Sequence, residues 1–306
     1  MYKVVVAIVV GFIFLVGNIA SAQVLDPEDG PRAWKKENTK QEEAVVLSHV
    51  RQADVTWAKR VWREIDLRQK QNLVLYYPLD SATLGKRSFV QVLADMVRDS
   101  HNNPGPDALK VYESYELKEL VQLDELKNKL SFTDSVPVLI DPDECIIERM
   151  PKSVDFITEG KPLVTKIVLM EDWFFDKQRS VMDVRILALG LKVPTFQADI
   201  QPHPICIDNV MNGFIPVPNG EQILWFFFPD LRQAMASNEI FNRHNDAHRT
   251  SFDDLFMKRM FASYIIKEEN VYDRYIADYT SGMDALLEAE KISEGIRDYE
   301  MDFWQY

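Results

Sequence analysis

Apolar residues near the N-terminus recur with the spacing of one helix face. Ala58, Val61, Trp62 and Ile65 follow one another at positions i, i+3, i+4 and i+7, which is the pattern of an amphipathic helix. Asp54 precedes them, and Asp is a preferred N-cap residue. We therefore expect a helix that begins near residue 54 and ends before residues 76–78.

A second helix is expected over residues 88–98, where Phe89, Val92, Leu93 and Met96 share one face. Two prolines and a glycine in residues 102–106 then break the chain. Beyond this break the pattern is weaker. Residues 136–140 favour a strand, and residues 117–130 fit either a charged helix or a long excursion.

The middle of the chain favours antiparallel strands. Residues 164–170 are rich in β-branched and apolar side chains, residues 176–179 are suited to a turn, and apolar positions then alternate with polar ones over residues 182–188. This pattern predicts a hairpin with one solvated face near its turn. Residues 223–228 are apolar at every position, as in a central strand.

The C-terminal third is expected to be helical. Thr250 and Ser251 precede Asp253 and Asp254 with the spacing of a capping box, and a predicted apolar stripe follows at Met257, Met260, Phe261 and Tyr264. A last helix over residues 283–296 is expected to bury Ala285, Leu286, Ala289, Ile292 and Ile296. The sequence thus predicts the α+β class, with central antiparallel strands at about 163–191 and 223–228 between N-terminal and C-terminal helices.

The first 22 residues have the pattern of a secretory signal peptide. Lys3 is followed by an apolar stretch over residues 4–16 and by the small-x-small sequence of residues 20–22. The alternative is a membrane anchor. The residue after the expected cut is Gln23 and not Cys, so the mature chain has no N-terminal thiol to lipidate. We expect a soluble protein of the periplasm.

Charge and composition limit the partners and the domain plan. The net charge of −13 becomes −14 when residues 1–22, which carry Lys3 and no acid, are removed, so binding to nucleic acid through phosphate neutralisation is not expected.

Residues 23–50 are polar and charged and predict a flexible arm, with a strap that orders on a neighbouring subunit as the alternative. Residues 51–306 are expected to form one α+β domain, with a sub-boundary near 100–160 as an alternative.

No catalytic pattern stands out. The 11 glycines form no phosphate-binding loop, and no cofactor is expected. His244 and His248 are spaced as two ligands on one helix face could be, but solvated histidines are the favoured interpretation over a metal site. The acidic pairs at 171/172, 253/254 and 268/269 are interpreted as solvated surface or helix caps. Cys145 and Cys206 leave pairing and non-pairing equally open.

Aromatic and basic side chains are concentrated in a few short segments instead. Trp, Tyr and Arg are the residues that anchor protein interfaces, although each aromatic residue has the hydrophobic core as its alternative. The candidate interface residues are Trp57, Arg60, Trp62, Arg63, Tyr76, Tyr77, Asp172, Trp173, Phe174, Phe175 and Arg179.

These segments resemble the GldN/PorN family, the periplasmic ring component of the type IX secretion and gliding-motility apparatus of Bacteroidetes. The resemblance lies in residues 53–68, 76–78, 171–180 with Arg185, 238–243 and 272–274. It is weakest over residues 100–160.

The resemblance implies a structural protein and not an enzyme. It implies assembly with an outer-membrane lipoprotein into a periplasmic ring, self-association in that ring, and contact with the periplasmic part of the inner-membrane motor. The alternatives are a periplasmic zinc-dependent hydrolase using His244 and His248, or a cell-wall-binding module.

Overall fold

A computed structural model describes most of the chain beyond its N-terminal arm. The described residues are 43–79, 86–103, 105, 108–122, 131–141, 146–155, 164–202, 209–242, 245 and 248–303. All of them belong to one compact unit, Lys40–Tyr306.

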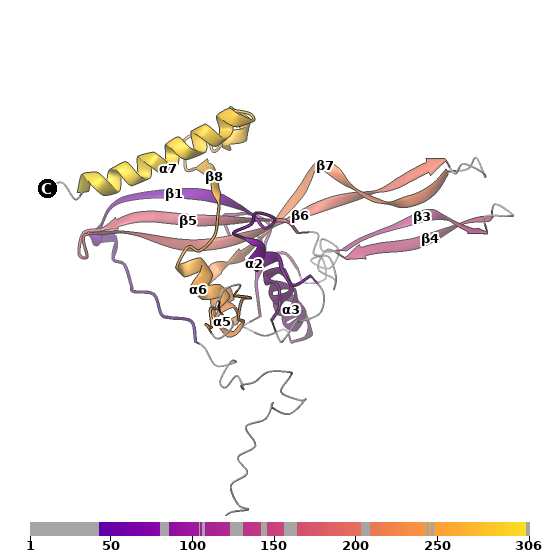
Figure 1. The fold of residues 1–306 in the computed structure, drawn as a ribbon, viewed down its shortest axis with the longest axis horizontal. Coiled ribbons are helices and arrows are strands. Elements are labelled where there is room, and N and C mark those ends of the chain that lie inside the picture. The colour runs from indigo at the N-terminus through magenta and orange to yellow at the C-terminus, as the bar shows by residue number, and fades with distance from the viewer. Residues whose placement is uncertain are drawn as a thin grey trace, which may run out of the picture. The chain divides into compact units, whose positions relative to one another are not determined.

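The centre of this unit is a six-stranded antiparallel sheet in the order β2-β7-β6-β5-β1-β8. Its strands are β1 (Val55–Asp66), β2 (Val111–Tyr112), β5 (Lys166–Asp176), β6 (Val181–Pro202), β7 (Asn209–Phe227) and β8 (Tyr264–Glu268). Figure 1 shows the first and last strands, β1 and β8, side by side at one end of this order. The sheet therefore joins the N-terminal and C-terminal parts of the domain.

Two long strand pairs extend outside the region where the central strands pair on both sides. The part of β6 beyond Lys192 pairs with β7 alone, because the ladder to β5 ends at Lys192. The strands β3 (Ser131–Asp141) and β4 (Ile146–Asp155) form a separate two-stranded sheet.

The main core lies between the sheet and a group of helices. The helices are α2 (Leu73–Tyr76), α3 (Phe89–Asn102), α5 (Phe228–Ser237) and α6 (Phe252–Met257). Phe89 and Phe256 are fully buried, with ring centroids 5.2 Å apart, and they join a cluster that includes Leu189 and Phe226 of the sheet. Burial of each such side chain stabilises the fold by about 1.5–3 kcal/mol.

A second cluster attaches the C-terminal helix α7 (Met283–Phe303) to the sheet. Ala289, Ile292 and Ile296 are spaced along one helix face and pack with Val61 and Ile265. The 3₁₀ turns η2 (Gln52–Asp54) and η3 (Ile276–Asp278) precede β1 and α7 respectively.

The expected helix near residue 54 is wrong: these residues form β1. Neighbouring strand residues point to opposite faces, and Val61 and Trp62 are both buried, so both faces of β1 are covered at this point. In a strand that is buried on both faces, apolar and polar residues no longer alternate. The apolar residues of β1 therefore matched the spacing of a helix face. Asp54 lies in η2 and accepts a hydrogen bond from Arg51.

The C-terminal third is also less helical than expected. Helix α6 ends at Met257, Arg259 has a left-handed φ of 53°, and Tyr264 begins β8. The predicted stripe therefore spans a helix, a turn and a strand. Within α7, Leu286 is 51% exposed rather than buried.

Other predictions are confirmed, including the α+β class and the hairpin of β5 and β6. Ser251 is the N-cap of α6 and forms the predicted capping box with Asp254, and Ser88, the N-cap of α3, forms another with Gln91. The strand at 136–140 lies in β3, and the apolar segment 223–227 ends β7, while Phe228 begins α5.

Gly190 of β6 provides a test of the sheet's packing. A Cβ there would lie 2.7 Å from Ile223 Cγ2 and 3.1 Å from the Trp225 ring, so Gly190→Ala is expected to destabilise the fold by about 1–3 kcal/mol. The matched control is Gly295→Ala in α7, where a Cβ meets nothing within 4 Å and the change should stabilise by about 0.5–1 kcal/mol. Urea unfolding of both variants measures the difference, and equal stabilities would contradict this packing.

Candidate functional site

The two longest segments singled out in the sequence lie side by side in the sheet. Strand β1 pairs antiparallel with β5 so that Arg60 is opposite Asp172 and Lys59 is opposite Trp173. The Arg60 guanidinium donates to both carboxylate oxygens of Asp172, at 2.6 and 2.8 Å. The bidentate pair raises the pKa of Arg60, although burial opposes the rise.

Next to this pair lies a buried charged group that we call the Glu171 cluster: Glu171, Arg63, Trp173 and Arg259. The Glu171 side chain is fully buried and accepts from Arg259 Nη1 and Nη2 at 2.8 and 3.1 Å and from Trp173 Nε1 at 3.1 Å. Arg63 Nε is 3.4 Å from Glu171 Oε2. Both guanidinium groups lie over the Trp173 ring, at 5.8 and 5.1 Å from its centroid.

The Glu171 cluster corrects the interpretation of Glu171 as solvated surface. It also makes Arg63 and Trp173 partners of a buried carboxylate: the Arg63 side chain is 13% exposed, and Trp173 is half-buried. Burial lowers the pKa of Arg63, and the nearby Glu171 carboxylate opposes that effect. The same correction applies to Asp253, which is buried in a bidentate ion pair with Arg232, both contacts being 2.9 Å.

A second buried carboxylate, Glu64, is surrounded by two lysines and a tyrosine. Lys166 Nζ is 3.1 Å from Glu64 Oε1, and Lys192 and the Tyr264 hydroxyl both donate to the carboxylate. Burial by itself would raise the pKa of Glu64, but the hydrogen bonds from Lys192 and Tyr264 and the lysine charges lower it overall. These contacts join β1, β5, β6 and β8.

The Lys267 ammonium of β8 is enclosed by aromatic rings. Lys267 is 1% exposed, and its Nζ lies 4.7 Å from the Trp62 ring, 4.6 Å from Tyr115 and 4.9 Å from Tyr275. It also forms an ion pair with Asp273, which accepts from the Tyr115 hydroxyl at 2.9 Å. We call this group the Lys267 cage; it makes Trp62, a predicted interface residue, part of the core.

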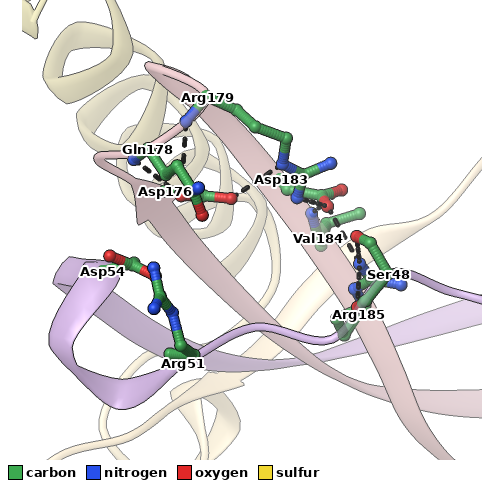
Figure 2. A network of polar contacts seen from close by, with 9 residues as sticks. All are labelled: Ser48, Arg51, Asp54, Asp176, Gln178, Arg179, Asp183, Val184 and Arg185. Carbon is green, nitrogen blue, oxygen red and sulfur yellow. Dashed lines mark hydrogen bonds and ion pairs between the residues drawn. The ribbon is translucent and has the colours of Figure 1, made fainter.

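A polar network at the β5–β6 turn contains Arg179, the last predicted interface residue along the chain (Figure 2). Arg179 donates to Asp176 at 2.7 Å and to Asp183 at 3.0 Å, and its hydrogen bond lowers the pKa of Asp176. Arg185 of β6 donates to the carbonyl oxygen and the hydroxyl of Ser48, at 3.3 and 3.1 Å. Ser48, in the segment before β1, thus contacts β6 close to this turn.

The remaining predicted interface residues are distributed between core and surface. Phe174 is 6% exposed, whereas Tyr77 is 48% exposed and packs edge-on against the half-buried Tyr76. Phe175 is half-buried opposite Trp57 in the ladder. Trp57 lies in a groove of about 270 Å³ beside α7, with its ring centroid 5.3 Å from that of Tyr299.

Some charged residues of these clusters were missed by sequence reasoning. Arg259 and Lys267 lie outside the segments that carry the resemblance, whereas Asp273 lies inside one of them but was given no role. The missed signal at Lys267 was a lysine inside a short apolar strand pattern. Such a charge is buried only with a partner.

Most residues of the metal and disulfide predictions lie outside the described part of the chain. His248 is exposed in a non-helical segment, and His244, Cys145 and Cys206 lie outside the described residues. Within the described ranges, no group of three or more His, Cys, Asp or Glu residues is arranged to hold a metal ion.

The fold and these clusters define an α+β protein in which the two segments that form β1 and β5 pair in one sheet and are held by buried ion pairs. The sequence profile described as "Gliding motility associated protein GldN" matches residues 50–305, and the chain belongs to this family. Members of this family are gliding-motility components, and the family is not known as an enzyme family. No curated protein matches the chain.

None of the helices in the described part of the chain combines the length and the apolar character that a membrane span requires.

The buried and exposed carboxylates of one segment can be compared directly. Glu171→Gln would remove a fully buried carboxylate charge and leave the guanidinium groups of Arg63 and Arg259, which are 13% and 26% exposed, without their counter-charge, and we expect a loss of about 3–5 kcal/mol of unfolding free energy. The neighbouring Asp172→Asn is the matched control, because that ion pair is about one-third exposed and is worth no more than about 1 kcal/mol. Chemical denaturation that finds similar losses for the two variants would contradict the assigned role of Glu171.

Glu64 predicts a pH-dependent contribution to stability. Since its folded pKa is lowered, its ionised contacts stabilise the protein above the usual carboxyl pKa of about 4.3, and this stability is lost as the pH falls through the folded pKa. Glu64→Gln should therefore be less stable than the wild type at neutral pH, and the gap should close in acid. Urea unfolding between about pH 7 and pH 3 measures it, with exposed Glu290→Gln as the control; a gap that is constant with pH would argue against this role.

Proposed function

We propose that this chain is a non-enzymatic structural component of the type IX secretion and gliding-motility machinery of the periplasm. In this role it assembles with an outer-membrane lipoprotein into a ring and contacts the inner-membrane motor. The observation that carries the proposal is the match to the gliding-motility family over residues 50–305. The proposed location is the periplasmic side of the outer membrane, reached through the lipoprotein.

The physical character of the domain supports a load-bearing role. Three buried charged groups, centred on Glu171, Glu64 and Lys267, cross-link strands that come from both ends of the sequence. Removing one partner of such a buried pair leaves an uncompensated charge, so alternative registers of these strands are disfavoured. A subunit that transmits force in an assembly benefits from this rigidity.

The segments singled out in the sequence then divide into two roles. Trp62, Phe174 and Glu171 stabilise the sheet because they are buried, whereas Tyr77 and Arg179 remain accessible to a partner. Tyr and Arg are typical anchors of protein interfaces. No observation on the described residues favours the zinc-hydrolase or the wall-binding alternative.

The proposal is tested by co-expressing the mature chain with the lipoprotein encoded beside it. Co-purification followed by negative-stain electron microscopy should show large closed rings. A chain that stays monomeric and leaves the lipoprotein behind would contradict the proposal.

Substitutions separate the two roles. Tyr77→Ala should reduce recovery of the lipoprotein or the motor fragment at least several-fold while leaving the melting temperature nearly unchanged, because Tyr77 is half exposed and interface anchors of this type carry binding energy. Trp62→Ala is the contrasting variant and should lower the melting temperature, since truncating a buried Trp costs about 3–5 kcal/mol. Normal recovery of both partners by Tyr77→Ala would remove Tyr77 from the interface.

A further inference from the structure

The first half of β1 has an open edge on the side where β8 pairs with the second half. The ladder to β8 covers only Val61–Glu64, so among the described strands residues 55–60 pair with β5 alone. On the β8 side the Arg60 carbonyl oxygen accepts from the backbone N–H of Glu269 at 2.9 Å. Backbone groups of successive residues face opposite sides of a strand, so the N–H and C=O of the exposed Ala58 face the open side. Such an edge is a template for a further strand.

The groove of about 270 Å³ between β1 and α7 lies beside this edge. Trp57 and Lys59 of β1 line it, and so do Ile292, Gly295 and Tyr299 of α7. A Cβ added at Gly295 would meet nothing within 4 Å, so the groove has room for a side chain at this point. Side chains alternate between the two faces of a strand. Every second side chain of a strand added to the open edge would therefore face this groove.

The helix that forms one side of the groove is strongly acidic. Helix α7 carries seven Asp or Glu residues against one Lys and one Arg, a net charge of −5. The charged residues that line the groove itself balance one another: Lys59 pairs with Glu268 at 2.6 Å, and Lys291 pairs with Glu288 at 3.5 Å. The site therefore suits an extended segment with an apolar side chain for the groove and basic side chains on either side of it.

The N-terminal arm of the chain contains a segment of this kind. Residues 31–36, which lie outside the described residues, read Pro-Arg-Ala-Trp-Lys-Lys and carry three bases and no acid. In an extended conformation Arg32, Trp34 and Lys36 share one face, so an aromatic side chain stands between two cations. Residues 23–42 as a whole have five acids and four bases, so the positive charge is concentrated in this one segment.

The path of the chain before β1 takes the arm away from its own groove. The Ala44 backbone nitrogen lies 3.5 Å from the Gln233 side-chain oxygen of α5, and Leu47 lines a small pocket with Phe228 of the same helix. Helix α5 contacts β6 and β7, whereas α7 contacts β8 at the other end of the sheet order. The twenty residues 23–42 that precede this point can span up to about 70 Å when extended, which is enough to reach another copy.

We infer that residues 31–36 of one copy add as a strand to the open edge of β1 in a second copy and place Trp34 in the groove beside Tyr299. The backbone of the added strand pairs with Ala58, and its basic side chains lie next to the acidic helix α7. Because the arm and the groove are different surfaces, the contact is head-to-tail, which closes into rings or continues as filaments. This inference rests on the proposed function and names the self-association contact that it requires.

Cross-linking of the mature chain tests which copy supplies the arm. A carbodiimide joins an amine to a carboxylate in contact with it, and a mixture of isotopically labelled and unlabelled chains separates links between copies from links within one. Lys35 or Lys36 should be linked to carboxylates of α7 in the other chain. Links that occur only within one chain would mean that the arm occupies its own groove, and the absence of such links would mean that it occupies neither; both results contradict the inference.

Substitutions on both sides of the contact test its chemistry. Trp34→Ala, the double variant Arg32→Glu with Lys36→Glu, and the groove-filling Gly295→Phe should each weaken self-association at least tenfold in sedimentation velocity over a concentration series. The matched controls are Lys40→Glu, in the arm but outside residues 31–36, and Gly295→Ala, which adds only a Cβ; both should self-associate as the wild type does. Hydrogen exchange at Ala58 should slow as the wild type self-associates but not in Trp34→Ala.

The same variants are compared in the complex with the lipoprotein. If Trp34→Ala and Gly295→Phe form rings and self-associate as well as the wild type, the inference is wrong and the proposed function stands. If Gly295→Phe loses the lipoprotein but keeps its self-association, the lipoprotein occupies the groove and the inference is again wrong. If both variants lose self-association but the wild type never recovers the lipoprotein, the inference holds and the proposed function fails. A wild type that remains monomeric in both settings overturns both. Melting temperatures within about 2 °C of the wild type establish that the variants fold.

Discussion

The antiparallel pairing of β1 with β5 is the constraint on which the rest of this structure depends. It places two segments separated by more than a hundred residues in one ladder, with Arg60 opposite Asp172. A shift by one residue would turn every side chain to the other face, so Glu171 would lose Arg63 and Arg259. The register and the buried ion pairs therefore require each other.

Within the described part of the sheet, buried charge is used at three places where an apolar core would be the ordinary solution. The desolvation of Glu171, Glu64 and Lys267 costs free energy that the ion pairs and ring contacts must offset. What such groups add is selectivity for one arrangement, since each charge has partners from particular strands. Lys267, for example, meets Trp62 of β1 and two tyrosines from separate loops.

The surface is as informative as the interior. Tyr77, the turn at Val271 and Tyr272, and the C-terminal half of α7 expose aromatic or apolar side chains next to charged ones. The buried clusters hold the strands that carry these surfaces, and Asp273 links the turn at Val271 and Tyr272 directly to the Lys267 cage. A rigid interior with several small exposed anchors is the character that the proposed assembly role would need.

The sequence by itself determined the family, the α+β class, the β5–β6 hairpin, the capping box of α6 and the start of α7, because these depend on local patterns and on long motifs. It did not determine that residues 55–66 form a strand, since burial on both faces removes the alternation that identifies one. Nor did it distinguish the buried Glu171 from the half-exposed Asp172 beside it. That difference was decided by tertiary structure, because the guanidinium groups that neutralise Glu171 come from β1 and from the turn after α6, and local sequence carries no record of which distant charges will meet.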